Sequence, residues 1–213
     1  MARRLPVYLL LDTSGSMSGE PIEAVKNGMQ ILVSTLRQDP YALETAHLSV
    51  ITFDSDAKQL VALTELSSFQ IPNIRASGTT SLGEALCLLA SKIDSEVAKT
   101  TPEQKGDWKP LVFLMTDGSP TDDIRKGIDA IKKVKTGIIV ACAAGSGADT
   151  NVLKQITEVV VSLDTTDADA IKAFFKWVSS SVTTGSQKTE EGQKEIGGLD
   201  DLPPPPPEIN IVL

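Results

Sequence analysis

Short apolar runs alternate with segments of helical periodicity along most of the chain. The runs are typical of buried strands and span 5–11, 48–53, 59–63, 111–115, 137–143 and 158–163. Between them, apolar residues recur every three or four positions, which predicts helices over 22–36, 82–97, 124–134, 152–156 and 171–178. Strands that alternate with helices form mostly parallel sheets covered on both faces. We therefore expect an α/β fold with a doubly wound, mostly parallel six-stranded sheet and helices on both faces.

The strands at 48–53 and 59–63 depart from the parallel order. They are joined by a short polar turn that contains Asp54 and Asp56. A parallel crossover needs a dozen residues or more, so these two strands must be antiparallel. The sequence thus predicts one antiparallel edge strand, and it predicts Asp54 and Asp56 to be solvated turn residues.

The composition changes near Thr183. Ser, Thr, Gly, Gln and Glu dominate from there, and five consecutive prolines follow at 203–207. Such a segment buries too little apolar area to fold alone, and consecutive prolines favour a stiff polyproline II conformation. We expect a folded domain over 1–183 and an acidic, proline-rich flexible tail over 184–213. The apolar end, 209–213, is either a docking strand, a strand lying on its own domain, or a frayed terminus.

Composition and charge exclude several classes of partner and location. The 213 residues carry a formal net charge of −8, and no cluster of Lys and Arg offsets it, which argues against binding to nucleic acid. No stretch approaches the roughly 18 apolar residues of a membrane span. The first apolar run is too short for a signal peptide and ends at Asp12. Cys87 and Cys142 stand alone in apolar runs, typical of reduced core thiols. We expect a cytoplasmic protein with no membrane insertion.

Three polar residues follow the first strand directly. Asp12, Ser14 and Ser16 alternate, so an extended turn can aim all three side chains at one point. In an open α/β sheet, ligands bind at the carboxyl ends of the strands. A carboxylate and two hydroxyls are hard oxygen donors, which suit Mg²⁺ or Mn²⁺. The alternative is an ordinary turn and helix cap, since Asp and Ser are common in both.

Two further loops favour the metal site. Residues 77–83 open the second long helix and offer several hydroxyls, and Asp117 follows the strand at 111–115. The first strand and this one flank the expected reversal of strand order. Asp12 and Asp117 should therefore face one crevice.

In these three loops the chain resembles a von Willebrand factor A domain with a metal-ion-dependent adhesion site. The residues that carry the resemblance are Asp12-x-Ser14-x-Ser16, a threonine between Gly78 and Gly83, and Asp117 within Thr-Asp-Gly. The resemblance covers residues 1 to about 183. Through residues 116–122 and the acidic, proline-rich tail, the chain is most similar to TerY-type bacterial proteins of tellurite-resistance operons.

The resemblance implies a ligand set. Ser14, Ser16 and a threonine would ligate the ion directly, and Asp12 and Asp117 would contact it directly or through water. Thr80 is the expected threonine because it stands three residues before Gly83, with Thr79 as the alternative. Mg²⁺ prefers near-octahedral coordination, which leaves a position for an oxygen from outside. A Glu or Asp carboxylate of a partner protein would fill it.

The function implied is a non-enzymatic, metal-dependent adaptor of a bacterial tellurite or stress response, working beside a protein kinase and a phosphatase. The alternative is a metal-assisted phosphohydrolase of small substrates, and a third possibility is a purely structural metal. A haloacid-dehalogenase-type phosphatase would need a second Asp where Ser14 stands. His47, the only histidine, is expected to be a capping or partly buried residue. No catalytic residue is therefore expected.

Two smaller expectations concern the second half of the chain. Asp122 and Asp123 should cap the helix that follows them, with a place on an acidic rim near the metal as the alternative. Lys132, Lys133 and Lys135 should be an ordinary solvated helix end.

Overall fold

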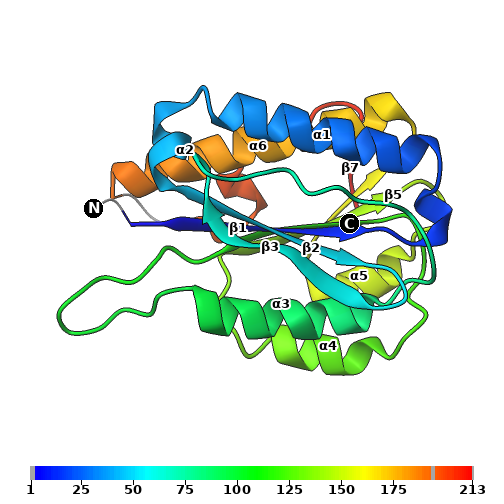
Figure 1. Cartoon of the computed structure of the whole chain (residues 1–213), viewed down its shortest axis with the longest axis horizontal. Coiled ribbons are helices and arrows are strands. Elements are labelled where there is room, and N and C mark those ends of the chain that lie inside the picture. Colours follow the sequence, from blue (N-terminus) through cyan, green and yellow to red (C-terminus); the bar gives the residue numbers. More distant parts are fainter. Residues whose placement is uncertain (1–2, 193–194, 213) are drawn as a thin grey trace.

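A seven-stranded sheet separates two groups of helices in the computed structural model, which describes residues 3–192 and 195–212 (Figure 1). The strand order is β3-β2-β1-β4-β5-β6-β7. The strands are β1 (Leu5–Asp12), β2 (Ala46–Phe53), β3 (Ala57–Glu65), β4 (Leu111–Thr116), β5 (Ile138–Ala144), β6 (Val159–Leu163) and β7 (Asn210–Ile211). The helices are α1 (Glu20–Leu36), α2 (Pro40–Thr45), α3 (Leu82–Glu96), α4 (Ile124–Ile131), α5 (Thr150–Ile156) and α6 (Ala168–Glu190), with short 3-10 turns at Gly15–Met17 and Leu199–Asp201.

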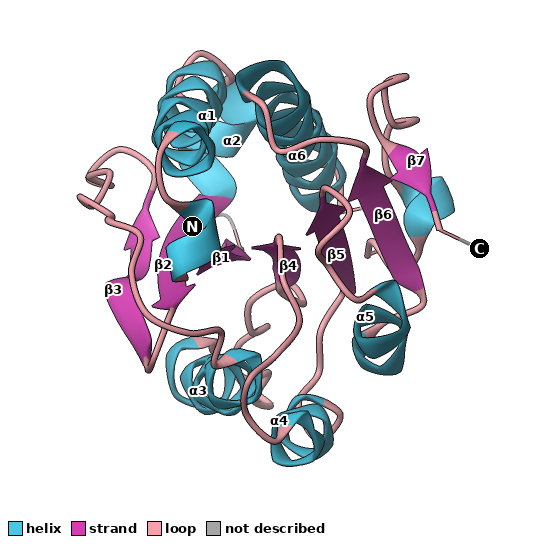
Figure 2. Ribbon diagram, turned by 90° about the vertical axis from the view of Figure 1, so that its right-hand side faces the viewer, coloured by secondary structure: helices cyan, strands magenta, loops and turns pink. Residues whose placement is uncertain are grey.

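The two faces of the sheet are covered by different helices. Figure 2 shows α1, α2 and α6 over one face, and α3, α4 and α5 over the other. Successive side chains of β1 pack on opposite faces of the sheet. Leu9 belongs to the apolar cluster with α1 and α6, and Leu10 belongs to the cluster with α3 and α4. A parallel strand covered on both faces is apolar throughout, as the sequence of β1 is. The expected α/β architecture is confirmed.

The strand order reverses beside β1. This strand pairs in parallel with β2 on one side and with β4 on the other. The connections that leave β1 and β4 therefore run to opposite faces of the sheet, to α1 and to α4, which leaves a crevice at the carboxyl ends of these two strands. Both strands end there in Asp or Thr, at Asp12 and Thr116.

The predicted antiparallel pair is present, and the sequence missed one helix. Strand β3 pairs antiparallel with β2 at the sheet edge, from His47 opposite Glu65 to Phe53 opposite Ala57. Helix α2 has only six residues, too few to show a periodic pattern. Its signal was local, since the Asp39 side chain accepts a hydrogen bond from the Ala42 backbone N–H and Pro40 begins the helix.

The C-terminal region differs from the expected flexible tail, and of the three alternatives for 209–213 it shows a strand lying on its own domain. Helix α6 continues past residue 183 to Glu190, and the described segment beyond it lies against the domain. There β7 pairs antiparallel with β6, so the sheet has seven strands and a second antiparallel edge strand. Three separated apolar residues of this segment are buried in the core, namely Ile196, Leu202 and Ile209. These contacts were not predicted because the segment is polar and proline-rich on average, and only single apolar residues in it are buried. Of the expected strand 209–213, Leu213 lies outside the described residues.

Two further findings concern the chain as a whole. In the described ranges no helix is long and apolar enough to cross a membrane. Cys87 and Cys142 are both free thiols, Cys142 fully buried and Cys87 half-buried. Burial raises the pKa of the Cys142 thiol far above its ordinary value.

Candidate metal centre

Asp12 is the buried base of the candidate site. It ends β1, and only 1% of its surface is exposed. Its Oδ1 accepts a hydrogen bond of 2.8 Å from the Ser14 backbone N–H, and its Oδ2 accepts one from the Thr116 hydroxyl. The carboxylate is thus held in place from two loops.

Ser16 links the first loop to the second carboxylate. Its Oγ donates a hydrogen bond of 2.7 Å to Asp117 Oδ1, and it lies 3.0 Å from Ser14 Oγ. The Asp12–Ser16 loop continues into the 3-10 turn Gly15–Met17, which turns the chain so that Ser14 and Ser16 stand side by side. Four of the predicted ligands therefore form one hydrogen-bonded group with Asp12 at its base.

The 77–83 loop is attached to the first loop through the backbone. The Gly15 N–H donates to the Gly78 carbonyl over 3.0 Å, and the Ser77 N–H donates to the Thr13 carbonyl over 2.8 Å. Gly78 has φ +74°, and a Cβ there would stand 2.3 Å from Ser55 Oγ. Both the positive φ and the close approach require glycine at this position.

Thr80 and Thr79 occupy different environments. Thr80 is buried, and its N–H and carbonyl both bond to Thr121, the N–H to the side-chain hydroxyl and the carbonyl to the backbone N–H. Its Oγ1 lies 3.7 Å from the point where a Cβ on Gly118 would be, directly beside the Asp117 loop. Thr79 is exposed, and its N–H contacts Ser55 Oγ instead. This placement favours Thr80 over Thr79 as a ligand.

The electrostatics of the site favour a cation. Burial raises the pKa of Asp12, and the nearby Asp117 charge adds to that rise, while the hydrogen bonds from Ser14 and Thr116 oppose it. Neither Asp12 nor Asp117 has a Lys, Arg or His partner among the ion pairs and hydrogen bonds of the described residues. A divalent ion would supply the missing positive charge.

The donor set fits a hard ion. No group of three or more His, Cys, Asp and Glu residues that could hold a metal occurs in the part of the chain that the structure describes. The site offers two carboxylates, so hydroxyls must supply the remaining ligands. Oxygen donors of this kind suit Mg²⁺ or Mn²⁺ and not a soft metal.

Asp122 and Asp123 do not share one role as expected. Asp123 caps α4 by accepting from the Arg125 backbone N–H, as predicted. Asp122 turns to α3 instead and accepts from the N–H groups of Gly83 and Glu84, at 3.0 and 2.8 Å. The cap on α3 thus comes from the Asp117 loop and fixes it against the 77–83 loop.

Three supporting residues were not among the predicted ligands. Thr116 orients Asp12, and Thr121 holds Thr80. Asp54, expected to be a solvated turn residue, accepts from the Ser81 N–H through its carbonyl. Of the three, only Thr116 could be suspected from the sequence, because it stands directly before Asp117.

Comparisons with known proteins find similar sequences and similar folds. The sequence model of the von Willebrand factor type A domain matches residues 7–177. An uncharacterized protein of Synechocystis sp. is 36% identical over 123 residues, which are 54% of this chain and 26% of that protein.

Two solved structures share the fold at low sequence identity. A von Willebrand factor type A protein from Catenulispora acidiphila has a TM-score of 0.64 at 14% identity, over 86% of this chain and 44% of that one. The pilus adhesin SpaC from Lactobacillus rhamnosus GG has a TM-score of 0.66 at 14% identity, over 85% of this chain and 31% of that one. The chain thus spans less than half the length of each of these relatives.

Proposed function

Because this chain belongs to the von Willebrand factor type A domain family, we propose that it is a protein-binding module with a metal-ion-dependent adhesion site. The hydroxyls of Ser14, Ser16 and Thr80 and the carboxylates of Asp12 and Asp117 would hold Mg²⁺ or Mn²⁺. The partner would present a Glu or Asp side chain to this edge of the sheet.

The observation that carries the proposal is the junction of Ser14, Ser16 and Asp117. Ser16 Oγ lies within hydrogen-bond distance of both Ser14 Oγ and Asp117 Oδ1 at the carboxyl ends of β1 and β4, beside the buried Asp12. Without an ion, two carboxylates at this edge repel an acidic partner. A bound divalent ion supplies positive charge and an open position for an outside carboxylate oxygen. Partner binding should therefore require the ion.

The module is proposed to be non-catalytic. His47, the one histidine of the chain, lies at the start of β2, at the amino end of the sheet and away from Asp12. The Asp12 carboxylate is occupied by bonds from Ser14 and Thr116, so it is poorly placed as a general base. Phosphate release from p-nitrophenyl phosphate in Mg²⁺ or Mn²⁺, lost in Asp12→Ala, would instead favour a phosphohydrolase.

The cellular setting of the proposal comes from sequence resemblance. Similarity to TerY-type proteins over residues 116–122 and the C-terminal segment supports a role in a bacterial tellurite or stress response. The same similarity supports a place in the cytoplasm beside a protein kinase and a phosphatase. The fold shared with a pilus adhesin supports protein binding in general.

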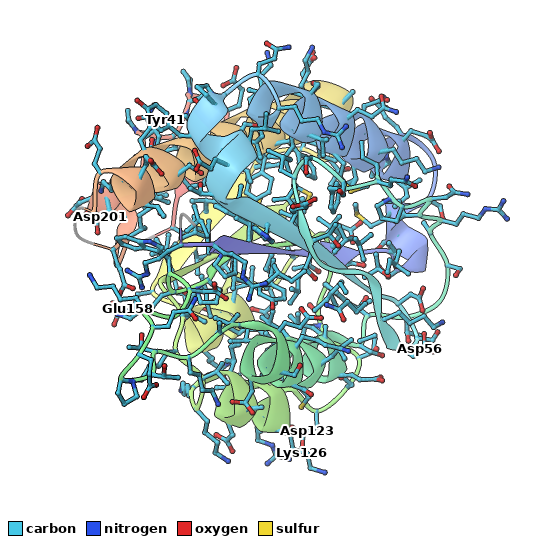
Figure 3. All side chains as sticks on the ribbon, turned by 60° about the vertical axis from the view of Figure 1, so that its left-hand side comes forward. Tyr41, Asp56, Asp123, Lys126, Glu158 and Asp201 are labelled. Atoms are coloured by element: carbon cyan, nitrogen blue, oxygen red, sulfur yellow. The ribbon has the colours of Figure 1, made fainter. Side chains whose placement is uncertain are left out.

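A pull-down from a lysate of the source cell tests the proposal. The baits are the wild-type chain in Mg²⁺, the same chain in EDTA, and Asp12→Ala in Mg²⁺. The matched control is Asp56→Ala, which removes an exposed carboxylate from the β2–β3 turn (Figure 3 labels Asp56), where it pairs with Lys58.

A partner held by the wild type and by Asp56→Ala in Mg²⁺, and lost from the other two baits, is the expected result. Equal capture by all four baits would place binding on another surface. Circular dichroism measures how much of the bait unfolds in EDTA. If the loss of captured partner in EDTA only matches the unfolded fraction, the ion has a purely structural role.

A further inference from the structure

A second cavity lies at the amino ends of the central strands, opposite the candidate metal centre. Its volume is about 540 Å³, within the roughly 300–1,000 Å³ typical of small-molecule sites. Its walls come from Arg3, which precedes β1, the loop 97–110 before β4, and the segment 133–135 before β5. Figure 1 shows the long loop between α3 and β4 extending past the start of β1. The cavity is therefore separate from the metal centre.

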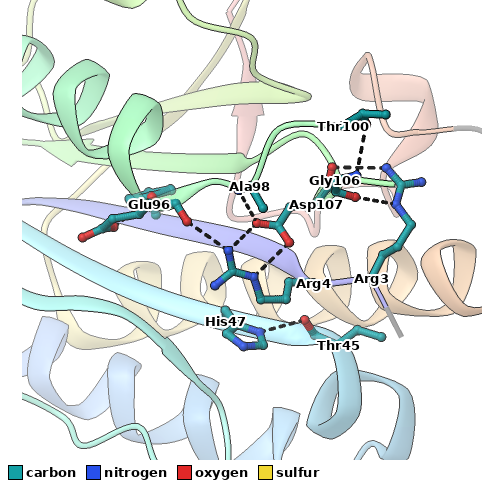
Figure 4. A network of polar contacts seen from close by, with 10 residues as sticks. Arg3, Arg4, Thr45, His47, Glu96, Ala98, Thr100, Gly106 and Asp107 are labelled. Carbon is teal, nitrogen blue, oxygen red and sulfur yellow. Dashed lines mark hydrogen bonds and ion pairs between the residues drawn. The ribbon is translucent and has the colours of Figure 1, made fainter. Parts of the chain in front are cut away.

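Polar contacts fix the base of this loop. The Arg4 guanidinium donates to both carboxylate oxygens of Asp107, and Asp107 in turn accepts from the Ala98 N–H (Figure 4). The Arg3 side chain donates to the backbone carbonyls of Gly106 and Asp107, at 2.7 and 3.2 Å. The cavity wall is thus held in place by the protein's own bonds, which lowers the cost of ordering it around a ligand.

Apolar side chains form the inner part of the cavity. Ile93 and Val97 contribute from the end of α3, and Val134 and Pro110 contribute from the segments before β5 and β4. Trp108 is buried beside them, and the Arg3 guanidinium lies 4.6 Å above the centre of its ring. One end of the cavity can therefore take an apolar group.

The charges around the cavity do not balance. Each of the three carboxylates that line it has a basic partner, in the pairs Asp94–Lys99, Asp107–Arg4 and Glu195–Lys109. Arg3, Lys133 and Lys135 also line it, and none of them has an ion pair with a carboxylate among the described residues. Three uncompensated positive charges thus surround a hollow in a chain whose formal net charge is −8. A concave, low-dielectric wall strengthens their attraction for an anion.

We propose that this cavity binds a small organic anion that joins an apolar body to a carboxylate or phosphate group. The apolar body packs against Val97 and Val134, and the anionic group is attracted by Lys133, Lys135 and Arg3. The two lysines were expected to be an ordinary solvated helix end. Their convergence with Arg3 on an apolar cavity is what assigns them a role.

Nuclear magnetic resonance on the ¹⁵N-labelled full chain tests the proposal. The chain has two tryptophans, so the indole N–H region holds two signals, Trp108 in the cavity wall and Trp177, which donates to the Pro203 carbonyl elsewhere and serves as reference. The probes are octanoate and monooctyl phosphate, with 1-octanol and inorganic phosphate to separate the apolar and anionic contributions.

Saturable movement of the Trp108 signal by octanoate, monooctyl phosphate or both is expected, with Trp177 unmoved. The stronger of the two anions identifies the head group. 1-Octanol and inorganic phosphate should bind at least about tenfold more weakly. No saturable movement with either anion, or equal binding of 1-octanol, would overturn the proposal.

A pair of double variants tests the lysines. Lys133→Gln with Lys135→Gln should raise the Kd of the bound anion about tenfold. The matched control is Lys126→Gln with Lys132→Gln, which removes the same charge from exposed residues of the same region outside the cavity lining (Figure 3 labels Lys126). An equal rise in Kd in both double variants would show that the anion responds only to the net charge of the protein, and this result would reject the site.

Discussion

The Ser16 hydroxyl donates a hydrogen bond of 2.7 Å to Asp117 Oδ1, although the two residues stand 101 positions apart in the chain. The contact exists because β1 and β4 are parallel neighbours and end at the same edge of the sheet. An exposed hydroxyl on a carboxylate contributes little to folding by itself. Its value lies in placing two hard oxygen donors side by side where an ion can use both.

Replacing Ser16 should therefore affect ion binding far more than stability. Ser16→Ala is expected to weaken Mg²⁺ or Mn²⁺ binding at least about tenfold, since it removes a ligand. The free energy of unfolding without metal should change by less than about 0.5 kcal/mol, because Ser16 is exposed. Isothermal titration calorimetry and urea unfolding measure the two quantities. Ser18→Ala, at an exposed neighbour, is the control, and an equal loss of affinity there would remove Ser16 from the ligand set.

The cap of α4 should give the stability a defined dependence on pH. Hydrogen bonds from the Arg125 side chain, and then from its backbone N–H, lower the pKa of Asp123 to about 2 from the ordinary 3.8. Because the folded-state pKa is lowered, this carboxylate stabilises the fold above the unfolded-state pKa. Its contribution is lost as the pH falls from about 4 through about 2.

Asp123→Asn isolates that charge, since asparagine also caps helices well. We expect wild type to exceed the variant in free energy of unfolding at neutral pH, and we expect the difference to shrink below about pH 4 and to vanish below about pH 2, as followed by urea unfolding. A difference that stays constant across this range would show that the charge of Asp123 plays no part.

The C-terminal segment should contribute measurably to the stability of the domain. Ile209 is buried in the core, whereas Ile211, two positions on, is 46% exposed. Ile209→Ala should cost about 2–3 kcal/mol through lost burial and the cavity left behind. Ile211→Ala in the same segment should cost less than about 0.5 kcal/mol. Equal and negligible losses in thermal and urea unfolding would mean that the segment is detached in solution.

The contact between α1 and α6 should tolerate no added methyl group at Gly28. A Cβ there would lie 2.2 Å from Phe175 Cδ2. Gly28→Ala gains about 1 kcal/mol of helix propensity, yet overpacking should outweigh it and leave a net loss of about 1–3 kcal/mol. Asn27→Ala, at the exposed neighbouring position, measures the propensity gain alone. A stabilised Gly28→Ala would show that Phe175 moves aside freely.

Much of the fold follows from sequence pattern because the parallel strands are buried on both faces. The run from Leu5 to Leu11 cannot be mistaken for a surface strand, and the short turn at 54–57 fixes the direction of its pair. For strand β7 the sequence only left a strand on its own domain as one of three alternatives, since a two-residue strand behind five prolines has no period to detect. Its position depends on the burial of Ile209, a long-range contact.

In the candidate site too, some residues could be predicted from the sequence and others depend on how the loops pack. The spacing of Asp12, Ser14 and Ser16 is local and readable, and strand order brings Asp117 to them. The loop around Thr80 is different, because only the spacing to Gly83 separates Thr80 from Thr79 in the sequence, whereas Gly78 and Thr121 fix the backbone of the loop in the structure. Asp122 caps the helix before it rather than the one after it, a choice that only the packing of two loops can make.

Strand β7 also protects the sheet against edge-to-edge aggregation between copies of this chain. Strand β6 carries three consecutive valines, Val159 to Val161, and without β7 it would present a row of unpaired backbone groups, a template for edge-to-edge aggregation. At the opposite edge β3 alternates between half-buried and exposed positions and carries Lys58 and Glu65, charges that discourage such pairing. The two edges of the sheet are thus protected by different means. Charged side chains protect β3, and the pairing of Asn210–Ile211 protects β6. Loss of the residues after 202 should therefore expose the edge of β6 and promote association between copies of the chain, which size-exclusion chromatography would detect as larger species.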